Sequence, residues 1–255
     1  GSIDTQVNAG GGVLFNDDPS VDAIIEIGRA HRRFGTTGFL PTLISDDLHV
    51  IERAIRAVQS AIERGVPGVL GIHIEGPFLN AERKGVHDAS KLRWLDEDGI
   101  ELLTSLEGGK TLVTLAPERT TPDIIRKLTQ AGVIVSAGHT NATYAQMQEA
   151  LAHGLTGFTH LFNAMSQLTG REPGVVGAAL EDQDSWCGLI VDGHHVEPAV
   201  LRIATRAKRR DRFMLVTDAM PSVGAPHKPF KLQGRPISVE DNMCIDEEGR
   251  LAGSD

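Results

Sequence analysis

The chain has 255 residues, 40% of them hydrophobic, and a formal net charge of −9 at pH 7, so we expect one domain with a large core. The acidic balance excludes nucleic acid as the main partner, because phosphate backbones select basic surfaces and no basic run here is longer than Lys208–Arg210. No apolar stretch approaches the roughly 20 residues that span a bilayer, and the two cysteines give neither zinc-type spacing nor a disulfide framework, so we expect a cytoplasmic protein with no membrane partner.

Eight short apolar runs predict β-strands along the chain. The clearest, Val69–Glu75, is apolar over most of its length and ends in a carboxylate, which is typical of a buried parallel strand that leads into a site. In chain order, the predicted strands are Ile3–Asn8, Thr37–Ile44, Val69–Glu75, Thr111–Ala116, Val133–Ala137, Gly157–Leu161, Gly188–Asp192 and Phe213–Asp218.

Stretches with apolar residues at three- and four-residue spacing separate these runs and predict helices. Glycines suit the ends of several of them, and proline suits the first turn of one. The predicted helices are Val21–Phe34, Leu48–Arg64, the weaker Leu92–Leu106, one that starts at Thr121–Pro122 and stops at Gly132, Thr143–His153 and Pro198–Arg209. Between Asn163 and Trp186 the helical pattern is poor, which predicts a long loop beside a binding site.

Eight strands that alternate with helices predict an α/β fold, a (β/α)8 TIM-type barrel, whose usual size is about 250 residues. A helix should follow the eighth strand, yet residues 221–255 show no helical period. Phe230–Val239 and Asn242–Leu251 instead predict short strands, so we expect 221–255 to be a β-rich insertion after strand eight. Because the chain enters its first strand at once and lacks the eighth helix, we expect it to be truncated at both ends.

Polar side chains end most of the predicted strands. An ionised carboxylate such as Glu75 is costly where a buried strand ends unless it is paired, hydrogen-bonded or bound to a metal. A lone histidine is more often a hydrogen-bonded core residue than a ligand, but a parallel barrel gathers its strand ends on one face. We therefore expect the strand-end residues to meet there; the others are Gln6, Asn8, His139, His160, Asp192, His194, His195 and Asp218.

Motifs along the whole chain carry a family resemblance: IDTQVNAGGGVLFND, GFLPTLIS, HIEGPFLN, KGVHD, SAGHTNAT, THLFNAMSQLTGREPG, GLIVDGHHV, LVTDAM and DEEGRLAGSD. The chain resembles the N-acetylglucosamine-6-phosphate deacetylases of the amidohydrolase superfamily. The resemblance implies a metal-dependent hydrolase that converts N-acetylglucosamine 6-phosphate to glucosamine 6-phosphate and acetate. It also implies a small β-sandwich built from both termini, which this sequence lacks, so the resemblance covers a barrel domain over residues 1–255.

The resemblance implies that Glu75, His139 and His160 bind one divalent metal ion. A carboxylate with two imidazoles suits zinc, the ion we expect, or iron(II), and leaves positions open for water. Many superfamily members have a His-x-His pair in the first strand that holds a second metal. Gln6 and Asn8 stand at those positions and are poor ligands, so we predict a mononuclear site in which Gln6 contacts a metal-bound water.

The implied chemistry is attack of a metal-activated water on the acetyl carbonyl, because a metal lowers the pKa of bound water toward about 7. Asp218, at the end of strand eight, is expected to take a proton from that water and return it to the departing amine, as general base and then acid. His195 is implied to bind substrate and polarise the acetyl carbonyl. His194 should point to the opposite face and is not assigned a role.

The phosphate of the substrate needs a local positive group on this acidic protein. The resemblance implies Arg171 as the phosphate ligand, with backbone donors at Asn163 and Ala164 and a further substrate contact from His87. It also implies a homodimer, in which residues such as His87 can cross from the partner subunit.

Two other readings of the sequence stay open. One is a hydrolase of another N-acyl substrate, such as a different N-acetylhexosamine phosphate or a cyclic amide. The other is a non-catalytic sugar-phosphate binder. The ligand set together with Asp218 argues against the second reading, whereas Arg171 cannot distinguish sugar epimers.

Overall fold

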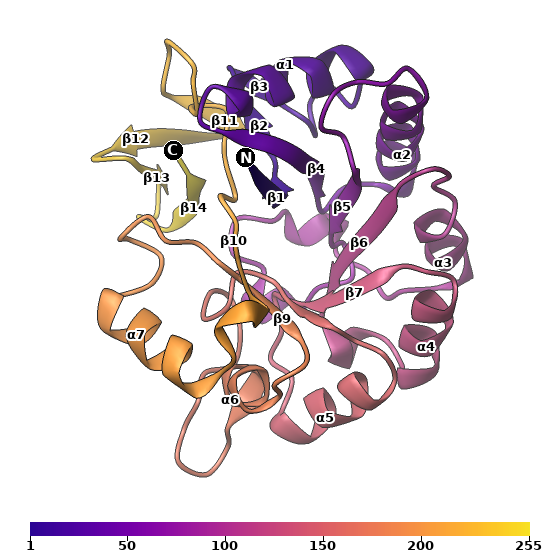
Figure 1. Cartoon of the computed structure of the whole chain (residues 1–255), viewed down its shortest axis with the longest axis vertical. Coiled ribbons are helices and arrows are strands. Elements are labelled where there is room, and N and C mark those ends of the chain that lie inside the picture. Colours follow the sequence, from indigo (N-terminus) through magenta and orange to yellow (C-terminus); the bar gives the residue numbers. More distant parts are fainter.

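The computed structural model describes residues 1–255, and eight parallel strands form its central sheet. The sheet rolls into a near-closed barrel with helices on its outer side, which confirms the predicted TIM-type architecture (Figure 1). In spatial order, its strands are β1 (Ser2–Val7), β4 (Thr36–Ile44), β5 (Gly71–Glu75), β6 (Lys110–Leu115), β7 (Ile134–Ala137), β8 (Gly157–Phe158), β9 (Trp186–Leu189) and β10 (Phe213–Leu215).

The barrel closes along a seam between its first and last strands. The only parallel bridge there pairs Val7 with Ala219, and the backbone N–H of Asp218 donates to the carbonyl oxygen of Gln6 at 2.9 Å. The eighth strand is shorter than predicted: it ends at Leu215, the backbone N–H of Thr217 donates to the Asp4 carboxylate, and Asp218 leaves the extended conformation with a φ of 51°. The seam therefore places Asp218 directly beside β1.

Six of the seven helices lie where the spacing of apolar residues predicted them. Local capping sets several starts: the Ser20 side chain accepts from Ala23 N, and Thr143 and Gln146 form a capping box. The helices are α1 (Val21–Arg32), α2 (Leu48–Glu63), α3 (Glu97–Leu103), α4 (Pro122–Gln130), α5 (Tyr144–Ala152), α6 (Gly174–Glu181) and α7 (Pro198–Ala207). None of them is long and apolar enough to cross a membrane.

The helix α6 corrects the prediction of a continuous loop between Asn163 and Trp186. Seven of its eight residues are buried, so the helix shows no polar face, and periodicity cannot reveal it. Gly174 begins it with a φ of 62°, and an added Cβ there would lie 2.8 Å from the carbonyl oxygen of Gln167. The glycines that suggested a loop instead permit close packing of a buried helix.

Residues after β10 form a four-stranded antiparallel sheet and no helix. Its strands are β11 (Phe230–Leu232), β12 (Arg235–Glu240), β13 (Met243–Asp246) and β14 (Leu251–Ser254), and the sheet lies beside the barrel near α1 (Figure 1). Short strands were predicted here, and Phe230–Val239 contains two of them, because Gln233 and Gly234, with φ of 49° and 80°, form a tight turn between β11 and β12. A second hairpin, β2 (Ala9–Gly10) with β3 (Val13–Leu14), follows β1.

Candidate metal centre and active site

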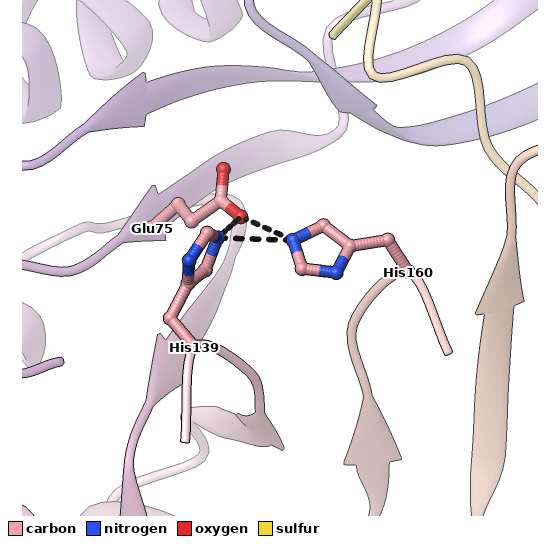
Figure 2. Close-up of side chains that lie close together, drawn as sticks. All are labelled: Glu75, His139 and His160. Carbon is pink, nitrogen blue, oxygen red and sulfur yellow. Dashed lines mark hydrogen bonds and ion pairs between the residues drawn. The ribbon is translucent and has the colours of Figure 1, made fainter. Parts of the chain in front are cut away.

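Three side chains from the ends of β5, β7 and β8 converge at one end of the barrel. Nε2 of His139 and Nε2 of His160 lie 3.1 and 3.0 Å from the same oxygen of Glu75, and 3.0 Å from each other (Figure 2). Four ligands arranged tetrahedrally at about 2.1 Å from an ion lie about 3.4 Å apart. The spacing of these three buried groups therefore fits one metal ion, and the structure brings together the three predicted ligands.

The ring of His139 is fixed by its other nitrogen. Nδ1 lies 2.8 Å from the carbonyl oxygen of Arg83, and because a carbonyl only accepts, Nδ1 carries the proton. Nε2 is then the nitrogen that faces the centre, and once it carries no proton it can act as a metal ligand. Nδ1 of His160 is buried and has no partner within the protein.

Glu75 is buried and ionised. Burial by itself raises the pKa of a carboxyl, but hydrogen bonds from His139 and His160 outweigh it and hold the pKa of Glu75 well below its usual range. A buried carboxylate and two imidazoles, which bind metals in their neutral form, make a set of ligands that suits zinc or iron(II). The residues present thus fit a divalent ion.

The backbone at the site is held in a sparsely populated conformation. His139, His160 and Asp218 have φ of 48°, 33° and 51°, in the left-handed region that residues other than glycine rarely adopt. Each such residue costs about 1–3 kcal/mol, so the surrounding loops must hold it in place. Three of the eight non-glycine residues with positive φ thus lie at the strand ends that make the site.

Asp218 is linked to the metal-ligand group through the amides of β1. Its Oδ1 accepts from Gln6 Nε2 at 3.1 Å and from Asn8 Nδ2 at 2.6 Å. Gln6 Nε2 also lies 3.3 and 3.4 Å from the two oxygens of Glu75. Both amide nitrogens thus point at carboxylates: Gln6 donates to Glu75 and to Asp218, and Asn8 donates to Asp218.

Burial, followed by the charge of Glu75, raises the pKa of Asp218 to about 6, above the ordinary value of 3.8. The stability that protonated Asp218 contributes is therefore present below pH 3.8 and lost as the pH rises through about 6. We expect Asp218→Asn to raise the melting temperature of the metal-free protein at pH 8 and to change it little at pH 4. Calorimetry at both pH values checks this; an equal shift at both would contradict it.

His195 faces the same cavity, and its orientation is set by Asp192. Asp192 Oδ2 lies 2.6 Å from His195 Nδ1, and Asp192 Oδ1 accepts from the backbone N–H groups of His194 and His195 at 2.9 Å. Nε2 of His195 is thus free to face the cavity. The side chain of His194, in contrast, is exposed. The sequence predicted Asp192 as one of the strand-end residues of the site but gave it no role, although its position three residues before His195 is a usable signal.

The cavity at this end of the barrel has a volume of about 430 Å³. Its lining includes the metal-ligand group and most of the predicted site residues: Glu75, His87, His139, His160, Asn163, Ala164, His195 and Asp218. Lys84 and Arg250 also line it. A larger surface groove, between α2 and α3, contains none of the predicted site residues.

Two predicted substrate contacts differ in how close they lie to the cavity. His87 is buried within its own chain, with Nδ1 at 2.8 Å from Ser45 Oγ, and burial, followed by His139, lowers its pKa to about 3. Arg171 is exposed and does not line the cavity.

The Asn163–Ala164 turn offers one free backbone donor. Asn163 N–H donates to the carbonyl oxygen of His160 at 3.0 Å, whereas Ala164 N–H makes no hydrogen bond within the protein.

Comparison with known proteins gives consistent matches along the chain. The family model described as "Amidohydrolase family" matches residues 1–237. An N-acetylgalactosamine-6-phosphate deacetylase of Shewanella sp. (strain ANA-3) is 45% identical over 254 residues, which cover 100% of this chain and 64% of that protein. An N-acetylglucosamine-6-phosphate deacetylase of Haemophilus influenzae is 38% identical over 257 residues, which cover 100% of this chain and 67% of that protein.

A solved structure shares the fold. The crystal structure of N-acetylglucosamine-6-phosphate deacetylase from Pasteurella multocida superposes with a TM-score of 0.95 at 38% sequence identity, and the match covers 100% of this chain and 67% of that one. The chain therefore spans about two thirds of the length of the relatives that it matches.

Proposed function

This chain belongs to the amidohydrolase family, and from that premise we propose that it hydrolyses the N-acetyl group of N-acetylglucosamine 6-phosphate to glucosamine 6-phosphate and acetate. The observation that carries the proposal is the convergence of Glu75, His139 and His160 beside Asp218 in one cavity. Similar proteins named as deacetylases of N-acetylhexosamine 6-phosphates support the substrate class.

Glu75, His139 and His160 would hold a single divalent ion, zinc in first place and iron(II) as the alternative. When bound, the ion supplies a Lewis acid that lowers the pKa of water toward about 7. Gln6 and Asn8 favour one ion over two, because both direct amide nitrogens at carboxylates and so do not offer oxygen ligands there. Gln6 instead fixes the distance between Glu75 and Asp218.

Asp218 would move the proton. In its ionised form it accepts a proton from the attacking water, and it returns this proton to the amine nitrogen as the C–N bond breaks. Burial raises its pKa to about 6, which brings the carboxyl closer to the operating pH that suits a group acting as both base and acid. Asp192 keeps His195 turned toward the cavity, where we assign it to the acetyl oxygen.

We assign phosphate binding to Ala164 N–H, Asn163 and His87 in the cavity and to Arg171. Since Arg171 is exposed and does not line the cavity of its own chain, we propose that it serves the site of a partner subunit in a homodimer. A guanidinium can make paired bonds to a phosphate, which an ammonium group cannot.

Arg171→Ala should raise KM for the 6-phosphate substrate by roughly ten- to a hundredfold, the worth of a charge-assisted hydrogen bond, and leave kcat/KM for the unphosphorylated sugar almost unchanged. Arg171→Lys should recover part of this loss. Mixing Arg171→Ala protomers with Asp218→Asn protomers should restore activity, because a mixed dimer contains one site with both residues intact. A mixture no more active than its parts would contradict a shared site, and an equal loss on both sugars would show that Arg171 is structural.

The proposed reaction is tested by acetate release from N-acetylglucosamine 6-phosphate, with metal content measured on the same sample. N-acetylgalactosamine 6-phosphate is the necessary comparison, because the Shewanella relative is named for that epimer. A higher kcat/KM for the galacto epimer would support this second candidate. Stoichiometric metal and sugar-phosphate binding without acetate release would instead support a non-catalytic binder.

A further inference from the structure

Glu118 connects loops of the site although it lies outside the cavity. It sits in the short η3 segment (Pro117–Arg119) that directly follows β6, a strand that supplies no predicted site residue. Its Oε1 accepts from Asn80 Nδ2 at 2.9 Å and from the backbone N–H of Asn141 at 2.7 Å. Its Oε2 accepts from Thr140 Oγ1 at 2.5 Å.

The donors to Glu118 belong to the loops that carry two of the metal-ligand residues. Asn80 lies five residues after Glu75, and its backbone N–H also donates to the carbonyl oxygen of His139 at 2.9 Å. Thr140 and Asn141 directly follow His139. Glu118 therefore joins the loop after β5 to the loop after β7.

The same network reaches the loop after β8. Thr140 N–H donates to the carbonyl oxygen of Ala164 at 3.1 Å, and Thr140 forms a parallel bridge with Met165. Ala164 follows His160 by four residues and lines the cavity. All three loops that bear metal-ligand residues are thus linked through the segment that Glu118 fixes.

His139 needs such support because its φ of 48° is unfavourable for a residue with a Cβ. The Arg83 carbonyl orients its ring, but the two residues after it are fixed by the Glu118 carboxylate. Without these bonds, the backbone at His139 is free to relax to an ordinary conformation, and Nε2 would move away from Glu75.

We propose that Glu118 is a positioning residue that holds His139 and the Glu75 loop in the geometry of the metal site and so sets the affinity for the metal. This inference rests on the proposed metal site. A direct role as ligand is excluded by geometry, because both oxygens of Glu118 are occupied by donors from the loops and the residue does not line the cavity.

The test measures zinc affinity of the metal-free protein, by competition with a chromophoric chelator, together with its melting temperature. Loss of a partner that orients metal ligands typically weakens metal binding about 10–100-fold, and we expect this for Glu118→Ala. Glu118→Gln should lie between Ala and the wild type, because one oxygen can still accept from Asn80 and Asn141 while the amide nitrogen cannot accept from Thr140. Glu97→Gln, which removes one exposed ion pair with Lys127, is the matched control and should bind zinc normally.

A merely structural role would lower the melting temperature of Glu118→Ala and leave the zinc dissociation constant unchanged, and that result overturns the proposal. If Glu118→Ala does not fold, Glu118→Gln and Asn80→Ala carry the test, because the first removes the bond from Thr140 and the second the bond from Asn80, and each should weaken zinc binding. Unaltered zinc affinity in both also overturns it. Zinc binding is read without substrate, so absence of acetate release would contradict the proposed activity alone.

Discussion

Glu75→Gln should empty the metal site and abolish hydrolysis together. Glutamine has almost the same shape, but it removes the negative charge that both Nε2 atoms face at 3.0 and 3.1 Å. Loss of a residue that only orients a metal ligand weakens metal binding about 10–100-fold, and loss of a direct ligand should weaken it more. We therefore expect metal content to fall from about one ion per chain to near none, measured by elemental analysis, and activity to fall with it.

His73 provides the control for Glu75, since it lies two residues earlier on the same strand. Its Nε2 lies 2.7 Å from Thr114 Oγ1 and its Nδ1 lies 3.4 Å from Thr42 Oγ1, so both ring nitrogens face hydroxyl groups. His73→Gln, which can keep the contact with Thr114, should retain the metal. Stoichiometric metal in Glu75→Gln, or metal loss in His73→Gln, would show that the ligand assignment is wrong.

Asp218→Asn should bind metal and substrate almost normally and lose kcat. An amide cannot accept the proton of the attacking water, whereas its oxygen can still accept from Gln6 or Asn8. General acid–base groups contribute about 10²–10⁴-fold, and a residue that serves both proton transfers belongs at the upper end. Steady-state kinetics and metal analysis on one preparation measure both quantities.

The control for Asp218 is Asp211→Asn, which removes an exposed ion pair with Arg209 at 2.7 Å and should leave kcat unchanged. If kcat of Asp218→Asn fell by less than about tenfold while its metal content stayed normal, the assignment of Asp218 as the proton-transfer group would be contradicted.

The barrel and its eight strands could be predicted because buried parallel strands are nearly continuous apolar runs, and their ends gather on one face. That rule was enough to anticipate that Glu75, His139, His160 and Asp218 meet. It does not give partners far apart in sequence: Glu118 accepts from Asn80, 38 residues earlier, and nothing local in either segment indicates it. The buried helix α6 was missed for the opposite reason, because burial on all sides removes the polar face that marks a helix.

Arg171 shows a different limit of the sequence. A motif identifies the residue type that suits a phosphate, but not whether the loop carries it into its own cavity. The structure places Arg171 on the surface, while Ala164 and His87 line the cavity. The sequence motifs around these three residues do not indicate which of them reaches the cavity. The difference lies in the hydrogen bonds of the loops, such as Ser45 to His87, which depend on the assembled barrel.

The seam of the barrel has a consequence for the order in which the site is assembled during folding. Glu75 ends β5, and His139 and His160 follow β7 and β8, so these three residues belong to one run of neighbouring strands. Asp218, in contrast, meets Gln6 across 212 residues of chain. Contacts between distant segments form late, because the entropy of closing the loop is lost before the contact contributes. We therefore expect a nascent barrel to bring Glu75, His139 and His160 together before Asp218 and Ala219 join β1. The proton transfer that we propose for Asp218 requires the first and last strands to meet, so the final step of ring closure would also complete the proposed site.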